Sequence, residues 1–172
     1  AVASAKPHKM TSDHLEHAGI LGEFQTVIGG DMVELACNYY DIMGKMADKF
    51  KFDIVGHFDL VTKFNEGYRL FNENDKRYIR AAEAALERLV PTGAAFEINT
   101  GAISRGKRTT PYPSADLLHV LKKLDAPLIL SADSHHKDTL DFAFEETKQC
   151  LREIGFTKLF TLRQGGFVPY QL

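Results

Sequence analysis

The sequence has few cysteines, little net charge and no long apolar run. Its two cysteines, Cys37 and Cys150, lie far apart within helical patterns, which predicts reduced, buried thiols of a cytosolic protein. No stretch reaches the roughly 18 apolar residues of a membrane span, and we recognise no signal peptide. We therefore expect a cytoplasmic protein with no membrane partner. The formal net charge of −2 argues against nucleic acid as a partner.

What is present is an ordinary globular composition. The 172 residues are 44% hydrophobic and 26% charged, enough for one domain with a core of its own. Residues 1–29 are weakly patterned, and we expect their three histidines to be solvated. The sequence begins with Ala1 and has no initiator methionine, so we expect it not to be the whole translated product.

Helical and strand patterns alternate from residue 31 onward. Helices are predicted over residues 31–50, 75–90, 114–124 and 138–155, and short strands over 54–55, 94–99, 128–131 and 159–162. The predicted buried faces are Met32, Leu35, Ala36, Tyr39, Met43 and Met46 in the first helix, Ile79, Ala82, Leu86 and Leu89 in the second, and Leu140, Phe144, Thr147, Cys150 and Leu151 in the last. This alternation predicts an α/β fold with a parallel sheet or barrel.

Polar residues follow two of these strands directly. Asp133 and His135 come after the strand at 128–131, and His57 and Asp59 come after the strand at 54–55. Residues i and i+2 of an extended chain point to the same side, so each pair can converge beyond the carboxyl end of its strand, where α/β folds place their chemistry. Carboxylate and imidazole ligands suit Zn, Mn or Fe. The alternative for Asp133 and His135 is a polar turn with a helix cap, and the alternative for His57 is a solvated loop histidine.

Two further features lie between these strands. Glu97 sits within the strand at 94–99, where alternation places it opposite Phe96 and Ile98. The loop at 100–108 carries three cations in four positions, among them Arg105. A guanidinium on such a loop suits phosphate recognition, although a surface run of charge is the alternative. His119 falls inside a regular helical pattern, which predicts a structural role.

Three ordered motifs, KFDIVGHFDLVTKFN, FEINTGAISRGKRTTPYPS and LILSADSHH, resemble the carboxy-terminal part of the PHP-domain phosphoesterases. Within that superfamily they are most similar to the monofunctional histidinol-phosphatase group. The stretch GGDMVELACNYY is a weaker match ahead of them, so the resemblance covers residues 30–172. It identifies residues 1–172 as a single, partial PHP domain.

The resemblance implies a fold, a cofactor and a set of residue roles. The family fold is a distorted (β/α)7 TIM-like barrel that holds two or three divalent metal ions at its carboxy-terminal face. By position, His57, Asp133 and His135 match metal ligands, and Asp133 or His135 would also be catalytic by moving the proton. Arg105 matches a basic residue that binds the substrate phosphate, and Glu97 matches a glutamate with a supporting role. The implied ions are Zn, Mn or Fe.

The sequence departs from the family in one respect. The family supplies early metal ligands from an H-x-H pair, and no H-x-H occurs in this chain. His8, in SAKPHKM, is a further candidate metal ligand by its place opposite the family's S-V-H strand end, but Lys6 and Pro7 interrupt the match. We therefore expect the chain to hold part of a metal site and to have little activity alone. A missing N-terminal barrel segment or another chain would complete the fold.

The activity implied is hydrolysis of L-histidinol phosphate to L-histidinol and phosphate in histidine biosynthesis. Its partner would be a small phosphorylated substrate. One alternative is a catalytically silent fragment or binding module of a PHP protein. Another is a PHP phosphoesterase that acts on a different small phosphate ester or on a nucleotide.

Overall fold

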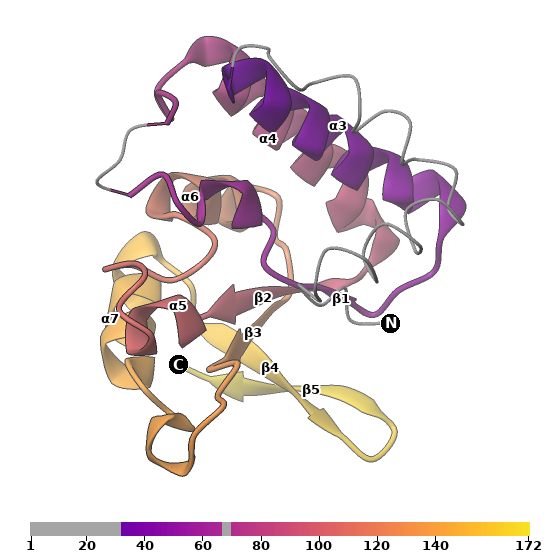
Figure 1. The fold of residues 1–172 in the computed structure, drawn as a ribbon. Helices are drawn as coiled ribbons and strands as arrows, with labels where there is room; N and C mark the ends of the chain where they lie inside the picture. The colour runs from indigo at the N-terminus through magenta and orange to yellow at the C-terminus, as the bar shows by residue number, and fades with distance from the viewer. Residues whose placement is uncertain (1–31, 67–69) are drawn as a thin grey trace.

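The computed structural model of the chain describes residues 32–66 and 70–172 (Figure 1). The weakly patterned segment at 1–29, with His8, His14 and His17, lies outside these residues. The described helices are α3 (Met32–Lys49), α4 (Lys76–Leu89), α5 (Gly101–Ser104), α6 (Ala115–Lys123) and α7 (Phe144–Ile154). The strands are β1 (Ile54–Val55), β2 (Ala95–Asn99), β3 (Leu128–Ser131), β4 (Lys158–Arg163) and β5 (Gly166–Gln171), with 3-10 turns η1 (Leu60–Thr62), η2 (Val90–Thr92) and η3 (Lys137–Thr139).

The five strands form one mixed sheet in the order β1-β2-β3-β4-β5. The first four are parallel, with Val55 opposite Phe96 and Asn99 opposite Ser131, and β5 is antiparallel to β4. The predicted α/β fold is confirmed, and the predicted parallel pairing holds for β1 to β4. Among the strands described, β1 and β5 stand at opposite ends of this row, so closure into a barrel stays a prediction.

The core lies between the sheet and the helices. In β2, Phe96 and Ile98 are fully buried, while Glu97 is only partly buried, so the predicted alternation is confirmed. Helices α3 and α4 lie side by side (Figure 1). They approach closely at Gly44, where an added Cβ would lie 3.4 Å from the Cα of Ala85.

This close approach explains why part of the predicted helix faces is wrong. The residues that α3 buries are Val33, Ala36, Tyr40, Ile42 and Gly44, so Met32 is 37% exposed instead. In α4, Ile79 is 39% exposed and Tyr78 is buried. Small residues at the crossing bring the two backbones together, and the buried face of each helix is the one that carries Tyr40 or Tyr78. Asp75 accepts a hydrogen bond from the Arg77 N–H and caps α4, at the start predicted for this helix.

The carboxy-terminal region differs more from its prediction. The helix predicted from residue 138 starts only at Phe144, and Leu140 is 66% exposed. Side-chain hydrogen bonds within residues 134–139, such as that between Ser134 and Thr139, compete with helix formation there. The last strand is followed by β5, which the prediction missed. Gly165 and Gly166 both have positive φ, the conformation that a tight hairpin turn requires.

Three smaller predictions can be assessed on the described residues. His119 is exposed on α6, so it is not a core residue. Cys37 and Cys150 are partly rather than fully buried, because each lies toward the edge of its helix's apolar face. No described helix is both long and apolar enough to cross a membrane.

Candidate active site

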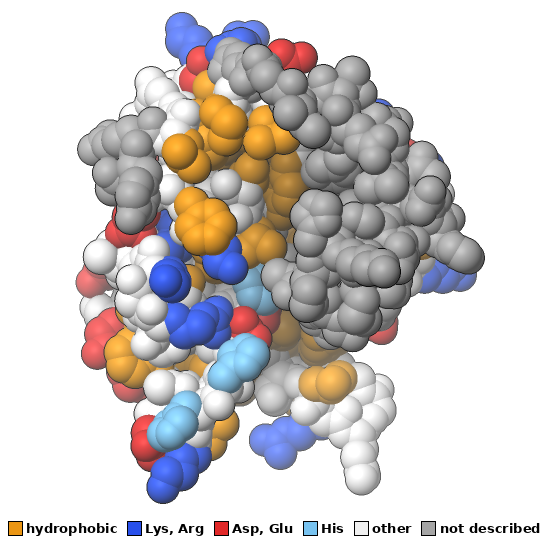
Figure 2. Space-filling model, in the orientation of Figure 1, with side chains coloured by type: hydrophobic (Ala, Val, Ile, Leu, Met, Phe, Trp, Pro, Cys, Tyr) orange, Lys and Arg blue, Asp and Glu red, His pale blue; other side chains and the backbone are white. Residues whose placement is uncertain are grey.

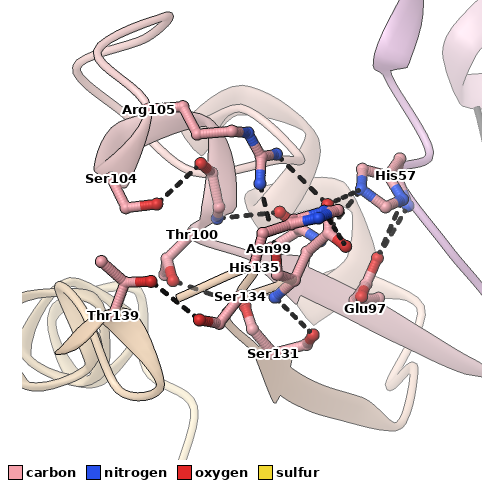
Figure 3. A network of polar contacts seen from close by, with 12 residues as sticks. His57, Glu97, Asn99, Thr100, Ser104, Arg105, Ser131, Ser134, His135 and Thr139 are labelled. Atoms are coloured by element: carbon pink, nitrogen blue, oxygen red, sulfur yellow. Dashed lines mark hydrogen bonds and ion pairs between the residues drawn. The ribbon is translucent and has the colours of Figure 1, made fainter. Parts of the chain in front are cut away.

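Three neighbouring parallel strands deliver polar side chains to one edge of the sheet. His57 follows β1, Glu97 and Asn99 lie on β2, and Asp133 follows β3. Because β1, β2 and β3 are adjacent and parallel, their carboxyl ends meet. Arg105 and His57 reach the resulting network from opposite sides, with Asn99 between them (Figure 3).

His57 is held by hydrogen bonds to β2. Its backbone N–H donates to Glu97 Oε2 at 3.1 Å, and its ring Nδ1 lies 3.2 Å from the same oxygen. Its other ring nitrogen, Nε2, lies 3.0 Å from Asn99 Nδ2. The ring is therefore held by two side chains of an interior strand, Glu97 and Asn99.

Asp133 is the meeting point of the predicted residues. Its Oδ2 lies 3.5 Å from His57 Nε2 and 3.2 Å from Arg105 Nη2, and its Oδ1 lies 3.8 Å from His135 Nε2. The structure thus brings His57, Arg105, Asp133 and His135 together. The geometric reason given above is wrong, however. Asp133 has φ 43° and His57 has φ 47°, so tight turns rather than extended i, i+2 spacing aim these side chains.

Arg105 reaches Asp133 because of the short helix α5. Its Nη1 donates to the Asp133 carbonyl oxygen at 3.0 Å, and its Nη2 donates to the carboxylate at 3.2 Å. The guanidinium folds back over Gly101, where an added Cβ would lie 2.9 Å from Arg105 Nη1 and 2.5 Å from the Ala132 carbonyl oxygen. A residue without a side chain is required at position 101.

Asp59, in contrast, belongs to the core. Its side chain is fully buried, and its Oδ2 accepts a hydrogen bond from the Ser114 N–H at 2.9 Å. Burial raises the pKa of Asp59 to about 6, although the Ser114 N–H and the Arg108 charge lower it in part. Asp59 secures the start of α6 and forms no hydrogen bond or ion pair with His57 or Asp133.

The three cations of the loop at 100–108, called the basic loop below, have different surroundings. Arg105 enters the site, Lys107 is exposed, and Arg108 is 8% exposed. Arg108 donates to the carbonyl and hydroxyl oxygens of Thr62 and lies over the Tyr112 ring, 4.8 Å from its centroid. Arg108 is therefore a structural cation, which the surface-charge interpretation of this loop did not anticipate.

On the molecular surface, histidine and acidic side chains lie close together, and basic side chains separate them from an apolar patch (Figure 2). A hollow of about 430 Å³ lies between η1 and the basic loop. Its lining residues are Lys63, Phe64, Glu66, Leu70, Gly106 and Lys107. From the basic loop, Gly106 and Lys107 line this hollow, and Arg105 does not.

Two side chains of the site, His57 and Asp133, are the right distance apart to be ligands of one divalent metal ion. Two ligands of a tetrahedral ion lie about 3.4 Å apart, close to the 3.5 Å between His57 Nε2 and Asp133 Oδ2. Glu97 on Nδ1 is the kind of outer partner that orients a ligating imidazole. Across residues 32–66 and 70–172, no cluster of three or more His, Cys, Asp or Glu side chains is arranged to hold an ion. The described chain therefore offers part of a ligand set.

Sequence reasoning missed two residues of this network, Asn99 and Gly101. Asn99 is fully buried and lies two residues after Glu97 on the same strand, so alternation could have placed it beside His57. Gly101 carried no comparable signal, because its importance depends on the folded position of Arg105.

Comparison with known proteins agrees with the motifs. No protein-family model matches the chain. A protein of Schizosaccharomyces pombe named probable histidinol-phosphatase is 28% identical over 139 residues, which is 80% of this chain and 45% of that protein. A Deinococcus radiodurans protein of the same name is 28% identical over 125 residues, which is 73% of this chain and 45% of that protein.

This chain is similar to histidinol-phosphatases. The two relatives confirm the resemblance that the three motifs indicated, because both are named probable histidinol-phosphatase. The chain spans less than half the length of either relative, so the activity of a whole protein remains a proposal.

Proposed function

We propose that this chain forms part of a metal-dependent phosphomonoesterase that hydrolyses L-histidinol phosphate. The observation that carries the proposal is the convergence of His57, Asp133 and Arg105 at the carboxyl ends of three adjacent strands. The names of the two relatives support the same activity. A partial (β/α)7 barrel, completed by another segment or chain, is the fold that we propose with it.

Each residue has a role that follows from its surroundings. A divalent ion held between His57 and Asp133, with further ligands from outside the described residues, would activate a water and polarise the phosphoryl group. Arg105 presents two N–H donors in a fork, which now contact Asp133 and match equally well the oxygens of a phosphate. The His135 side chain is 78% exposed, so it can exchange a proton with solvent.

The test measures phosphate release from L-histidinol phosphate with added Mn²⁺ or Zn²⁺. The chain is assayed beside the same chain extended by any upstream coding sequence. We expect His57→Gln and Arg105→Met each to lower kcat/KM by about 100-fold or more, since each removes a charge-stabilising contact. His119→Gln, an exposed change on α6, should leave it unaltered. Full activity of Arg105→Met, or inactivity of every form, would contradict the proposal.

The incomplete ligand set among the described side chains favours one alternative, a catalytically silent binding module. Metal analysis of the purified protein separates the two. Two or three bound ions support the phosphatase, and one or none supports the silent module.

A further inference from the structure

Arg105 contacts Asp133 through two hydrogen bonds at once. Its Nη1 donates to the Asp133 carbonyl oxygen at 3.0 Å, and its Nη2 donates to the carboxylate oxygen Oδ2 at 3.2 Å. The guanidinium lies over the backbone of Gly101, where an added Cβ would come within 3.0 Å of Nη2. Because the fold leaves this space for the guanidinium, the contact is a defined position of the Arg105 side chain, directed into the polar network (Figure 3).

The same contact takes up a carboxylate oxygen that a divalent ion would need. A divalent ion bound to a carboxylate oxygen lies about 2.1 Å from it. Since Asp133 Oδ2 is 3.2 Å from Arg105 Nη2, an ion on Oδ2 would lie no more than about 5.3 Å from the guanidinium. A guanidinium keeps its charge at every working pH, so the two cations repel each other. An ion and Arg105 therefore compete for Asp133.

Arg105 can leave Asp133 without disturbing the core. It directly follows the four-residue helix α5, and the side chains of Arg105 and Asp133 are 39% and 37% exposed. While Arg105 contacts Asp133, the fork formed by Nη1 and Nη2 is occupied. Turned away from Asp133, the same fork is free for the oxygens of a phosphate, whose geometry it matches. The side chain therefore has two alternative partners.

We propose that the contact of Arg105 with Asp133 is autoinhibitory: Arg105 occupies the carboxylate in competition with divalent ions, leaves it when an ion binds there, and is then free for the substrate phosphate. Binding is thus ordered, with the ion first and the phosphate second. The use of the released arginine rests on the proposed phosphatase function. The competition at Asp133 does not, because it follows from a carboxylate oxygen that both cations need.

The test measures the affinity of the full chain for Mn²⁺, without substrate, by electron paramagnetic resonance of the free ion. We expect Arg105→Met to bind Mn²⁺ about 10-fold more tightly than the unaltered chain, since the competing charge is gone. A residue that only bound phosphate would leave this affinity unchanged. The same Mn²⁺ affinity in Arg105→Met and the unaltered chain, or no measurable binding in either, would overturn the proposal.

Lys107→Met is the matched control, because it removes an exposed cation of the same loop. At about 0.15 M salt, which screens distant charges, it should change the affinity by less than about 3-fold. Equal gains in the Lys107→Met and Arg105→Met proteins would show a general effect of charge and would overturn the proposal.

Asp133→Asn shows whether Arg105 acts through that carboxylate. The change keeps the size of the side chain and removes the charge for which the two cations compete, so adding Arg105→Met should gain little further affinity. A further gain of about 10-fold in that background would contradict the proposal. Phosphate release is a separate measurement. Tighter Mn²⁺ binding by Arg105→Met, with no hydrolysis of L-histidinol phosphate by the unaltered chain or its extended form, would support the competition and contradict the proposed function.

Discussion

At His57, contacts from a single neighbouring strand define the position of the ring. Glu97 and Asn99 are successive residues on one face of β2, and they hold opposite nitrogens of the ring. A strand buried in the middle of a sheet is a rigid support for such contacts. Arg105, by contrast, extends from the end of a short helix, and its side chain is more than one third exposed.

Gly101→Ala should disturb that arginine selectively. The added Cβ would lie 2.5 Å from the Ala132 carbonyl oxygen and 2.9 Å from Arg105 Nη1, so α5 must shift and the Arg105–Asp133 contact should be lost. We expect a loss of about 1 to 3 kcal/mol in the free energy of unfolding together with impaired phosphate release. Urea unfolding and the phosphatase assay measure the two effects.

Gly56→Ala is the matched control, because its Cβ would meet only Glu97 Oε2, at 3.4 Å. A Gly101→Ala protein as stable and as active as the Gly56→Ala protein would mean that Arg105 does not depend on the open space at position 101.

Asp59 should make stability depend on pH. Burial raises its pKa from 3.8 to about 6, so the folded state binds the proton more tightly than the unfolded state does. The contribution of this group to the free energy of unfolding therefore falls as the pH rises from about 4 to about 6, and stays low above that. Asp59→Asn cannot ionise and should remove this slope. The pKa difference corresponds to about 3 kcal/mol at most, so the variant should be more stable at pH 8.

Urea unfolding between about pH 4 and about pH 8 measures this slope. Asp116→Asn, at an exposed position of α6, is the control and should keep it. If Asp59→Asn kept the slope as well, a different group would be responsible for the pH dependence.

At the level of elements, the segment between α5 and α6 is anchored to η1 and the residues beside it by polar contacts. Arg108 bonds to Thr62 of η1, and the Thr109 N–H donates to Glu66 at 3.0 Å. Asp59, just before η1, accepts from Ser114 at the start of α6. The loops after β1 and β2 are therefore tied together on the side of the sheet that carries the site.

Arg108→Met should weaken this anchor. The variant keeps much of the side-chain length but loses the hydrogen bonds to Thr62, and we expect a loss of about 1 to 3 kcal/mol in the free energy of unfolding. Lys107→Met removes the neighbouring exposed charge and should have little effect. Equal urea midpoints for the two variants would show that the buried contacts of Arg108 contribute nothing net.

At the scale of the whole molecule, the sheet ends in an exposed hairpin. Strand β5 is an edge strand, and the β4–β5 hairpin extends away from α3 and α4 (Figure 1). Leu162 is 66% exposed and Val168 is 46% exposed. An apolar edge strand favours pairing between chains, and a net charge of only −2 opposes association weakly.

Val168→Lys should therefore reduce self-association of the chain and leave its thermal stability nearly unchanged. Sedimentation velocity over a range of protein concentrations measures the association. Gln171→Lys adds the same charge to the same strand without removing apolar surface and should act less strongly. If the unsubstituted chain is monomeric at every concentration, the prediction that β5 promotes self-association is wrong.

Local sequence patterns determined the order of elements and the place of the site. The apolar runs at 54–55, 94–99 and 128–131 became β1, β2 and β3, and the polar residues after them converged because parallel neighbours bring their carboxyl ends to one edge. The helix predicted from residue 75 starts where expected, at the Asp75 cap, since capping depends on residues within one turn. The three motifs that resemble phosphatases could likewise be recognised, because each is one continuous stretch of sequence.

Only the tertiary structure decided the features that depend on contact between distant segments. The buried stripe of α3 was set by the close crossing at Gly44, and the interior position of Arg108 by its partner Thr62. The ring of His57 was held in place by Asn99, 42 residues away. Such choices follow from which groups meet across space, and neither periodicity nor residue spacing along the chain contains that information.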